Sequence, residues 1–145
     1  MPLKTVALVS LVLLVLNGCT AYRNMTRQED CDKVVKGYSR MIRWNEAEKA
    51  ALVFVDQPLR ESFGKSAESM RRRNVNMADM RILASECNAE KKNAEATVEF
   101  DYYMMPDNRL KTVTDRQKWI FREEDPKSPD LGEGWKLITP LPDFK

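Results

Sequence analysis

The chain opens with an apolar run and then changes to patterns typical of a folded domain. Thr5 to Leu16 is twelve residues without a charge, preceded by Lys4 and followed closely by Cys19. A helix of twelve residues rises about 18 Å, whereas the hydrocarbon core of a bilayer is about 30 Å thick. The pattern therefore predicts a secretory signal rather than a membrane span.

Apolar residues at helical spacing predict helices at about 30–44, 45–55 and 59–70. The first has an apolar stripe formed by Val34, Tyr38, Met41 and Ile42. Asn45 is expected as the N-cap of the second, whose apolar side contains Ala47, Ala50, Ala51, Phe54 and Val55. Pro58 separates the second helix from the third, because the residue before a proline avoids the α region.

From Val75 onward the hydrophobic period changes to two, which predicts strands at about 75–87, 94–104, 110–121 and 135–139. The clearest alternation has an apolar face of Ala94, Ala96, Val98, Phe100, Tyr102 and Met104. Its opposite face carries Glu95, Thr97, Glu99, Asp101 and Tyr103. Phe100 lies in the middle of the apolar face and is expected to be almost fully buried. Helices followed by meander strands predict an α+β fold, with N-terminal helices packed on one face of a curved antiparallel sheet of about four strands.

The expected organisation is a signal peptide at 1–18, a polar tether at 19–29 and a single α+β domain at 30–145. Removing 18 of the 145 residues leaves 127, enough for one domain with a core. Lys4 is the only charge lost, so 23 basic and 22 acidic residues remain. This balance argues against a nucleic-acid partner, because domains that bind nucleic acids carry an excess of basic residues.

Leu16, Gly18 and Cys19 resemble the lipobox of bacterial lipoproteins, in which the cysteine becomes the first residue and is acylated. A cysteine carrying two or three acyl chains is a stable membrane anchor. Two other interpretations remain open: a plain secreted protein and an uncleaved N-terminal anchor. In the sorting pattern of such lipoproteins, Thr20 in place of Asp indicates the outer membrane, facing the periplasm.

Cysteine and histidine usage narrows the chemistry further. After acylation of Cys19, Cys31 and Cys87 remain, and two thiols in an oxidising compartment favour a disulfide. Two free thiols are the alternative. The chain has no histidine, which excludes histidine-dependent catalysis and histidine metal sites. The sequence predicts no metal site and no cofactor.

A family resemblance follows from a Tyr-bearing helix, Arg43-Trp44-Asn45, a long hairpin, the run from Asp115 to Trp119 and the Gly134-Trp135-Lys136-Leu137 ending. Together these resemble the cone-shaped fold of the nuclear-transport-factor-two and ketosteroid-isomerase superfamily, and small uncharacterised bacterial lipoproteins of that shape. Cystatin-like proteins share the layout of a helix on a sheet and are the alternative. This fold contains both enzymes and binding modules, so it does not define a function.

Asp101, Tyr102, Tyr103 and Asp115 are the candidates for acid–base chemistry, because isomerases of this fold pair a carboxyl group with a tyrosine. Asp101 and Tyr102 have opposite strand parity and cannot both point into one cavity without a bulge, so no catalytic residue is assigned. Five aromatic residues are candidates for lining a pocket: Trp44, Phe100, Tyr102, Trp119 and Trp135. The run Arg71-Arg72-Arg73 is a candidate lipid contact or simply a solvated helix end.

The sequence therefore favours a lipid-anchored, non-enzymatic envelope protein, whose expected partner is another envelope protein. Its expected function is protein interaction or envelope assembly through the exposed sheet face. Charged residues on that face are expected to pair across strands, Glu95, Glu99 and Asp101 with Lys111, Arg116 and Lys118. Two alternatives remain: a carrier of a small apolar ligand inside the cone, and an isomerase or lyase that works without histidine.

Overall fold

The computed structural model describes the backbone of residues 2–145 and the side chains of residues 18–129 and 131–145. Its helices are α1 (Pro2–Arg43), α2 (Ala47–Val53) and α3 (Arg60–Arg72). Its strands are β1 (Val75–Asn88), β2 (Asn93–Met104), β3 (Lys111–Arg122) and β4 (Gly134–Leu137), and two short 3-10 helices are η1 (Gln57–Leu59) and η2 (Pro129–Leu131). The predicted signal peptide lies almost entirely outside the residues whose side chains are described.

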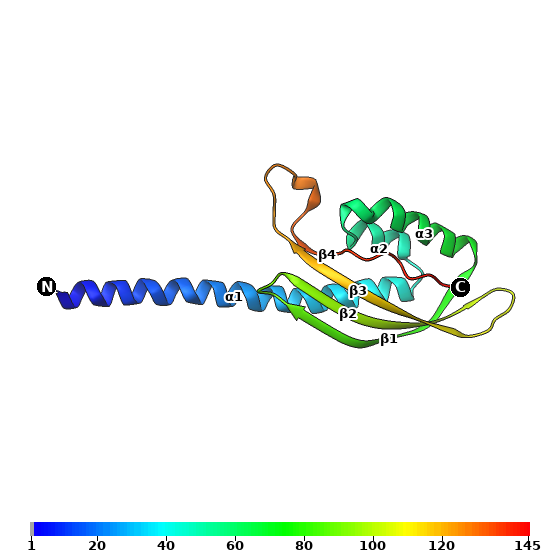
Figure 1. The fold of residues 1–145 in the computed structure, drawn as a ribbon, viewed down its shortest axis with the longest axis horizontal. Coiled ribbons are helices and arrows are strands. Elements are labelled where there is room, and N and C mark those ends of the chain that lie inside the picture. Colours follow the sequence, from blue (N-terminus) through cyan, green and yellow to red (C-terminus); the bar gives the residue numbers. More distant parts are fainter. Residues whose placement is uncertain (1) are drawn as a thin grey trace.

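The four strands form one antiparallel sheet in the order β1-β2-β3-β4. Helices α1, α2 and α3 cover one side of this curved sheet (Figure 1). Beyond β4, Val55 makes a parallel bridge to Leu137, so the segment after α2 covers that edge. The predicted α+β fold with helices on one face of a four-stranded sheet is confirmed.

Strand β2 has the predicted faces. Its apolar face is buried from Ala94 through Tyr102, and Phe100 has an exposed fraction of 0%. The other face is half-buried or exposed. Because successive side chains of a strand point to opposite sides, one correct register assigns the whole strand.

Helix α1 begins much earlier than predicted. The polar segment 19–29, expected as a tether before a helix starting near Asp30, is helical in the structure. Nothing between Cys19 and Asp30 breaks a helix, since the segment contains no Gly or Pro. Arg27 also fastens the segment to the sheet: its guanidinium lies 4.5 Å from the centre of the Phe121 ring. Figure 1 shows α1 extending well beyond the sheet at its N-terminal end.

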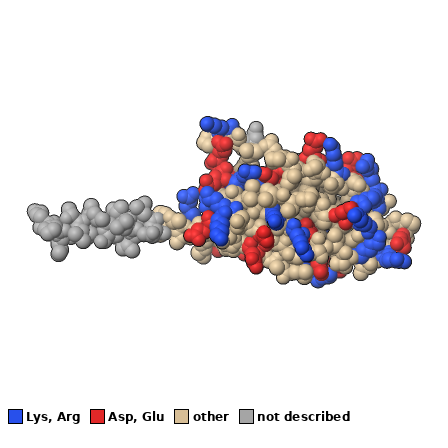
Figure 2. Space-filling model, viewed as in Figure 1, with Lys and Arg blue, Asp and Glu red and all other residues tan. Residues whose placement is uncertain are grey.

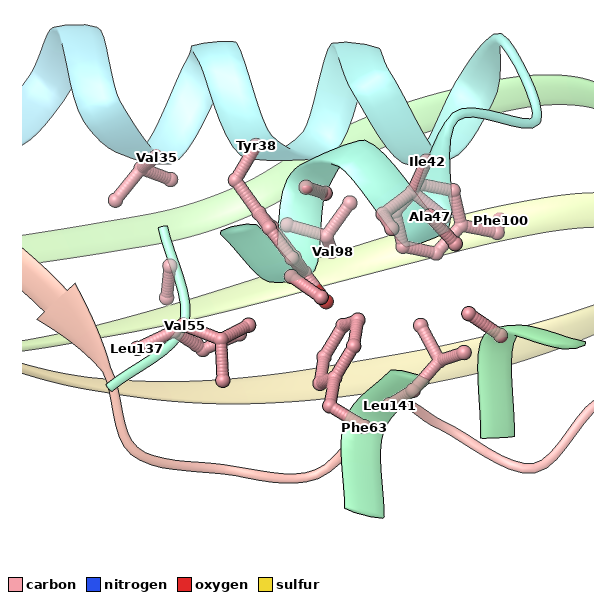
Figure 3. Packing of buried hydrophobic residues seen from close by; sticks show 14 of the residues in the cluster. Val35, Tyr38, Ile42, Ala47, Val55, Phe63, Val98, Phe100, Leu137 and Leu141 are labelled. Atoms are coloured by element: carbon pink, nitrogen blue, oxygen red, sulfur yellow. The ribbon is translucent and has the colours of Figure 1, made fainter. Parts of the chain in front are cut away.

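The buried stripe of α1 agrees with the predicted stripe at Tyr38 and Ile42, but it contains Val35 in place of Val34. It consists of Cys31, Val35, Tyr38, Ser39 and Ile42. Val34 and Met41 are only half-buried. Val35, Tyr38 and Ile42 point from α1 toward the sheet, where Val98 and Phe100 meet them (Figure 3).

Two local features also differ from the prediction. Asn45 is not an N-cap; it has a φ of 60° and follows the end of α1, a left-handed position that asparagine tolerates. Strand β1 keeps its period only in part, because register shifts occur between Met77 and Asp79 and between Ile82 and Ala84. Bulges of this kind reverse the faces that follow them.

Candidate functional site

Four of the five predicted pocket residues are buried in the interior, and of these Trp119 also contributes to the lining of a groove at one end of the sheet. Phe100, Tyr102, Trp119 and Trp135 have exposed fractions of 3% or less. Trp44 is wrong as a pocket residue: it is 67% exposed just beyond α1, with the Arg43 guanidinium 5.4 Å from its ring centre. The space between the helices and the sheet is therefore occupied by the protein's own side chains, which is the ordinary role of such aromatics.

Tyr38 organises the aromatic packing at the centre of this interior. Its ring lies edge-to-face against Trp119 at 5.6 Å and against Phe54 at 6.2 Å. Phe63, from α3, approaches it at 6.3 Å, and Figure 3 shows Phe63 reaching toward the Tyr38 side chain between the layers. Edge-to-face pairs at these distances add to the stability supplied by burial alone.

A short chain of polar side chains crosses the same interior. Gln117 Nε2 donates a hydrogen bond to Asp115 Oδ2 at 2.9 Å and lies 3.5 Å from Ser39 Oγ. The indole Nε1 of Trp119 donates to Gln117 Oε1 at 3.2 Å. Ser39, Asp115 and Gln117 are all buried. The Tyr38 hydroxyl, in contrast, has no hydrogen-bond partner among the described residues.

Burial changes the ionisation of two groups in this cluster. Loss of solvent raises the pKa of Asp115 from 3.8 to about 7, and the hydrogen bond from Gln117 opposes this rise. Burial also raises the pKa of the Tyr38 hydroxyl well above its ordinary value, with a further contribution from Asp115. Surface grooves occur beside Glu95, Asn45, Tyr22 and Phe144, and neither Asp115 nor Tyr38 lines any of them.

Asp115 was a sequence candidate, but its position on the buried face was missed. Strand β3 buries Asp115, Gln117 and Trp119 in alternation. Assigning Trp119 to the interior therefore assigns Asp115 to it as well, because the two are separated by an even number of residues. This shared parity is the feature of the sequence from which the buried position of Asp115 could have been predicted. Asp115 and Gln117 are polar, and polar residues are seldom fully buried. The alternation of apolar residues therefore did not assign them to the buried face.

Asp101 lies on the outer sheet face, as predicted, where it forms an ion-pair cluster. Arg81 Nη1 lies 2.6 Å from Asp101 Oδ2, and Arg81 Nη2 lies 3.1 Å from Glu99 Oε2. Thr112 Oγ1 donates to Asp101 Oδ1 at 2.6 Å. The hydrogen bonds from Arg81 and Thr112 lower the pKa of Asp101, which suits an ion-paired carboxylate and not a general base at neutral pH.

The expected pairing between strands β2 and β3 does not form. The partner of Glu99 and Asp101 is Arg81 on β1. Arg116 and Lys118 on β3 make no ion pair with any described residue, although Lys118 lies opposite Glu95 in the strand register. Two exposed cationic side chains therefore remain available on this face. Figure 2 shows acidic and basic side chains interspersed over the face of the molecule that it presents.

A groove of about 690 Å³ lies at the end of the sheet that contains the β1–β2 turn. Glu95, Lys118, Ile120 and Ile138 contribute to its lining, and α1 contributes Gln28. Opposite charges therefore lie beside two isoleucines in this groove. Protein interfaces likewise combine an apolar core with a polar rim. We take this groove and the adjoining outer face of β2 and β3, with Glu95, Arg116 and Lys118, as the candidate site and call it the outer sheet surface.

The cysteines occupy distinct environments. Cys31 on α1 and Cys87 on β1 form a disulfide with their Cα atoms 6.3 Å apart. Cys19, which lies in α1, is free and exposed. Each arginine of the 71–73 run lies within ion-pair distance of a carboxylate, on Glu48, Glu68 and Asp143 respectively. These contacts favour the solvated helix end over a lipid contact.

Two negative findings concern only the residues whose side chains are described. Among them, no group of three or more Cys, Asp or Glu side chains is arranged to hold a metal ion. Within the same residues, no helix combines the length and the apolar character needed to cross a bilayer.

Comparison with known proteins gives no family assignment. No family model matches the sequence, and no curated protein matches it; in particular, no enzyme family is indicated. Among solved structures, the chain has a weak similarity to the crystal structure of the intermembrane space region of the chloroplast protein ARC6. That match has a TM-score of 0.44 and 9% sequence identity, and covers 77% of this chain and 92% of the other. A similarity at this level carries no argument about function.

Proposed function

We propose that this protein is a non-enzymatic envelope lipoprotein, anchored through Cys19 in the outer membrane and facing the periplasm. Its role is protein interaction or envelope assembly, and its contact region is the outer sheet surface. The observation that supports this proposal is the contrast between a filled interior and an open outer face. Phe100, Trp119 and Trp135 occupy the space in which a carrier of this shape would hold a ligand.

Helix α1 connects the proposed anchor at Cys19 to the folded domain. A helix rises 1.5 Å per residue, so the twelve positions from Cys19 to Cys31 span about 18 Å. Helix α1 is continuous over this distance, and the disulfide joins its Cys31 to Cys87. A helical connection holds the domain at a defined distance from the lipid, whereas a flexible tether does not.

A crosslinking experiment tests the contact region. A photoreactive residue replacing Thr114, on the outer face of β3, should give one discrete adduct in intact envelopes of the native host. The same residue replacing Lys36, on the exposed side of α1, should not give that adduct. Both positions are exposed, so accessibility alone does not separate them.

Charge reversal makes the test specific. Arg116→Glu combined with Lys118→Glu should abolish the Thr114 adduct. Lys36→Glu combined with Arg40→Glu changes the net charge equally and should preserve it. An adduct that survives the first pair, or one that both pairs remove alike, would count against the outer sheet surface.

The anchor has its own test. Cys19→Ser should leave the chain without acyl label and unprocessed by the lipoprotein peptidase, because the serine hydroxyl does not replace the thiol in that chemistry. Metabolic labelling with a fatty acid measures this directly. Normal labelling of the Cys19→Ser variant would contradict the assignment.

A further inference from the structure

The segment 140–145 contributes a buried aromatic side chain to the core. The chain has no helix or strand after β4, yet Leu141 and Phe144 have exposed fractions of 7% and 1%. The Phe144 ring lies edge-to-face against Tyr102 at 5.1 Å and against Phe100 at 6.4 Å. Leu141 points into the same interior as Phe63 (Figure 3). Phe144 therefore fills space above β2 that neither a helix nor a strand fills.

Side-chain donors, and not a backbone ladder, hold this segment in place. Arg73 Nη1 donates to the carbonyl oxygen of Phe144 at 2.6 Å. The Tyr102 hydroxyl and Lys111 Nζ donate to the carbonyl oxygen of Lys145 at 2.6 and 2.9 Å. Within the described residues, 140–145 makes no backbone–backbone hydrogen bond. The segment can therefore leave without breaking the hydrogen-bond ladder of the sheet.

The charges around Phe144 belong partly to the segment itself. Asp143 lies 3.8 Å from Arg73 and 3.2 Å from the ammonium group of Lys145. Departure of the segment removes both Asp143 and Lys145. It leaves Arg73 and Lys111 beside the apolar space that Phe144 had filled. A groove of about 280 Å³ already runs between α3 and the segment, with Met70, Arg73 and Phe144 in its lining.

We propose that Phe144 occupies a binding site for a small aromatic carboxylate, and that the 140–145 segment is displaced when such a ligand enters. The apolar part of the site is formed by Phe100 and the ring of Tyr102. Its polar part is formed by Arg73, with Lys111 and the Tyr102 hydroxyl as further donors. An aromatic ring placed two carbons from a carboxylate reproduces the Phe144 side chain, its Cα atom and the carbonyl that Arg73 binds. The guanidinium fork suits a carboxylate better than a neutral carbonyl.

The probe follows from this geometry: 3-phenylpropionate, with 3-phenylpropanamide as its neutral counterpart. The complete chain, held in lipid bilayer discs, is titrated calorimetrically against each compound, with empty discs as the blank. Phe144→Ala should bind the acid at least tenfold more tightly than the unaltered chain, because the internal competitor is removed. The amide should bind at least tenfold more weakly than the acid. Phe144→Leu retains an apolar side chain and serves as the test variant if Phe144→Ala does not fold.

Two further variants separate a built site from a simple cavity. Arg73→Gln added to the Phe144 variant should weaken binding of the acid at least tenfold and leave the amide unchanged. Phe63→Ala removes a buried ring of the same size beside Tyr38 and should not bind the acid. Equal binding of acid and amide, or indifference to Arg73→Gln, would overturn the proposal. So would an absence of acid binding by a folded Phe144 variant. None of these results depends on the outer sheet surface.

Discussion

The inner and outer faces of the sheet each contain an aspartate, and the two aspartates behave in opposite ways. Asp115, on the inner face of β3, has its pKa raised to about 7 by burial. Asp101, on the outer face of β2, has its pKa lowered by hydrogen bonds from Arg81 and Thr112. Both residues lie in neighbouring strands of one small domain. Strand parity decides which of the two carboxyl groups is buried, and the neighbours on each face then raise or lower its pKa.

The same contrast holds for the aromatic and charged residues. Inward positions pack at high density around Tyr38, Phe100 and Trp119, whereas the neighbouring outward positions contact solvent or form ion pairs. Substitutions on the two faces should therefore differ in magnitude and in their dependence on pH and salt. Four measurements test this difference.

Phe100→Ala should produce the largest effect on stability. Removing a fully buried ring costs roughly 3–5 kcal/mol, including the cavity left behind. A domain of this size has about 5–15 kcal/mol in total. Glu99→Ala, one position away on the outer face, should cost less than about 1 kcal/mol. Chemical denaturation of both variants measures this contrast, and a larger loss for Glu99→Ala would reverse the assigned faces.

Loss of the disulfide should be next in magnitude. Cys31 and Cys87 are 56 positions apart, and closing a loop of that length stabilises the folded state by about 4 kcal/mol in the chain-entropy description. Cys31→Ser with Cys87→Ser should lower the denaturation midpoint accordingly. In the unaltered protein, alkylation after denaturation without reductant should label neither thiol. Labelling of both thiols would show that α1 is not covalently fastened to β1.

Asp115→Asn should change how stability depends on pH. The folded-state pKa of Asp115, about 7, exceeds the ordinary value of 3.8, so the folded chain binds the proton more tightly than the unfolded chain. The contribution of Asp115 to stability is then fully present below its unfolded pKa of 3.8 and is lost as the pH rises through about 7. At 1.36 kcal/mol per pH unit, the loss between pH 5 and pH 8 is about 2–3 kcal/mol. Asparagine stays neutral and can still accept the hydrogen bond from Gln117, so the variant should lack this loss.

Denaturation of both proteins at pH 5 and pH 8 gives the comparison. Asp101→Asn is the matched control on the outer face. Its folded-state pKa is lowered, so the carboxylate stabilises the folded state above the unfolded pKa, and that contribution disappears on acidification. Asp101→Asn should therefore leave the difference between pH 5 and pH 8 unchanged, and its own effect should appear only in acid, below the ordinary pKa of 3.8. Equal profiles for Asp115→Asn and the unaltered protein would show that Asp115 is solvated.

Arg81→Met should have the smallest effect of the four. The Arg81 side chain is substantially exposed, so water and salt screen its attraction for Asp101 and Glu99. The loss should shrink further as salt is added. NMR titration should show the pKa of Asp101 returning toward its ordinary value. An Asp101 pKa that stays low would assign the effect to Thr112 instead of Arg81.

Sequence periodicity was sufficient to predict β2 and the fold class. An unbroken alternation from Ala94 to Tyr102 has only one register that buries its apolar face. In the stripe of α1, Tyr38 and Ile42 were predicted correctly. Val34 was predicted in place of Val35, because the two are equally apolar and only the position of the sheet selects between them. The bulges of β1 were not visible either, since an inserted residue changes parity without any change in composition.

The candidate sites divide in the same way. The sequence by itself determined the lipobox-like cysteine, the absence of histidine and the outward position of Asp101, because each depends on residue identity or strand parity alone. Tertiary structure decided that four of the five predicted pocket residues are buried in the core, that Arg81 pairs with Asp101, and that Phe144 packs on Tyr102. These contacts join residues from different elements, and no local pattern of apolar and polar positions encodes which distant partner a side chain will meet.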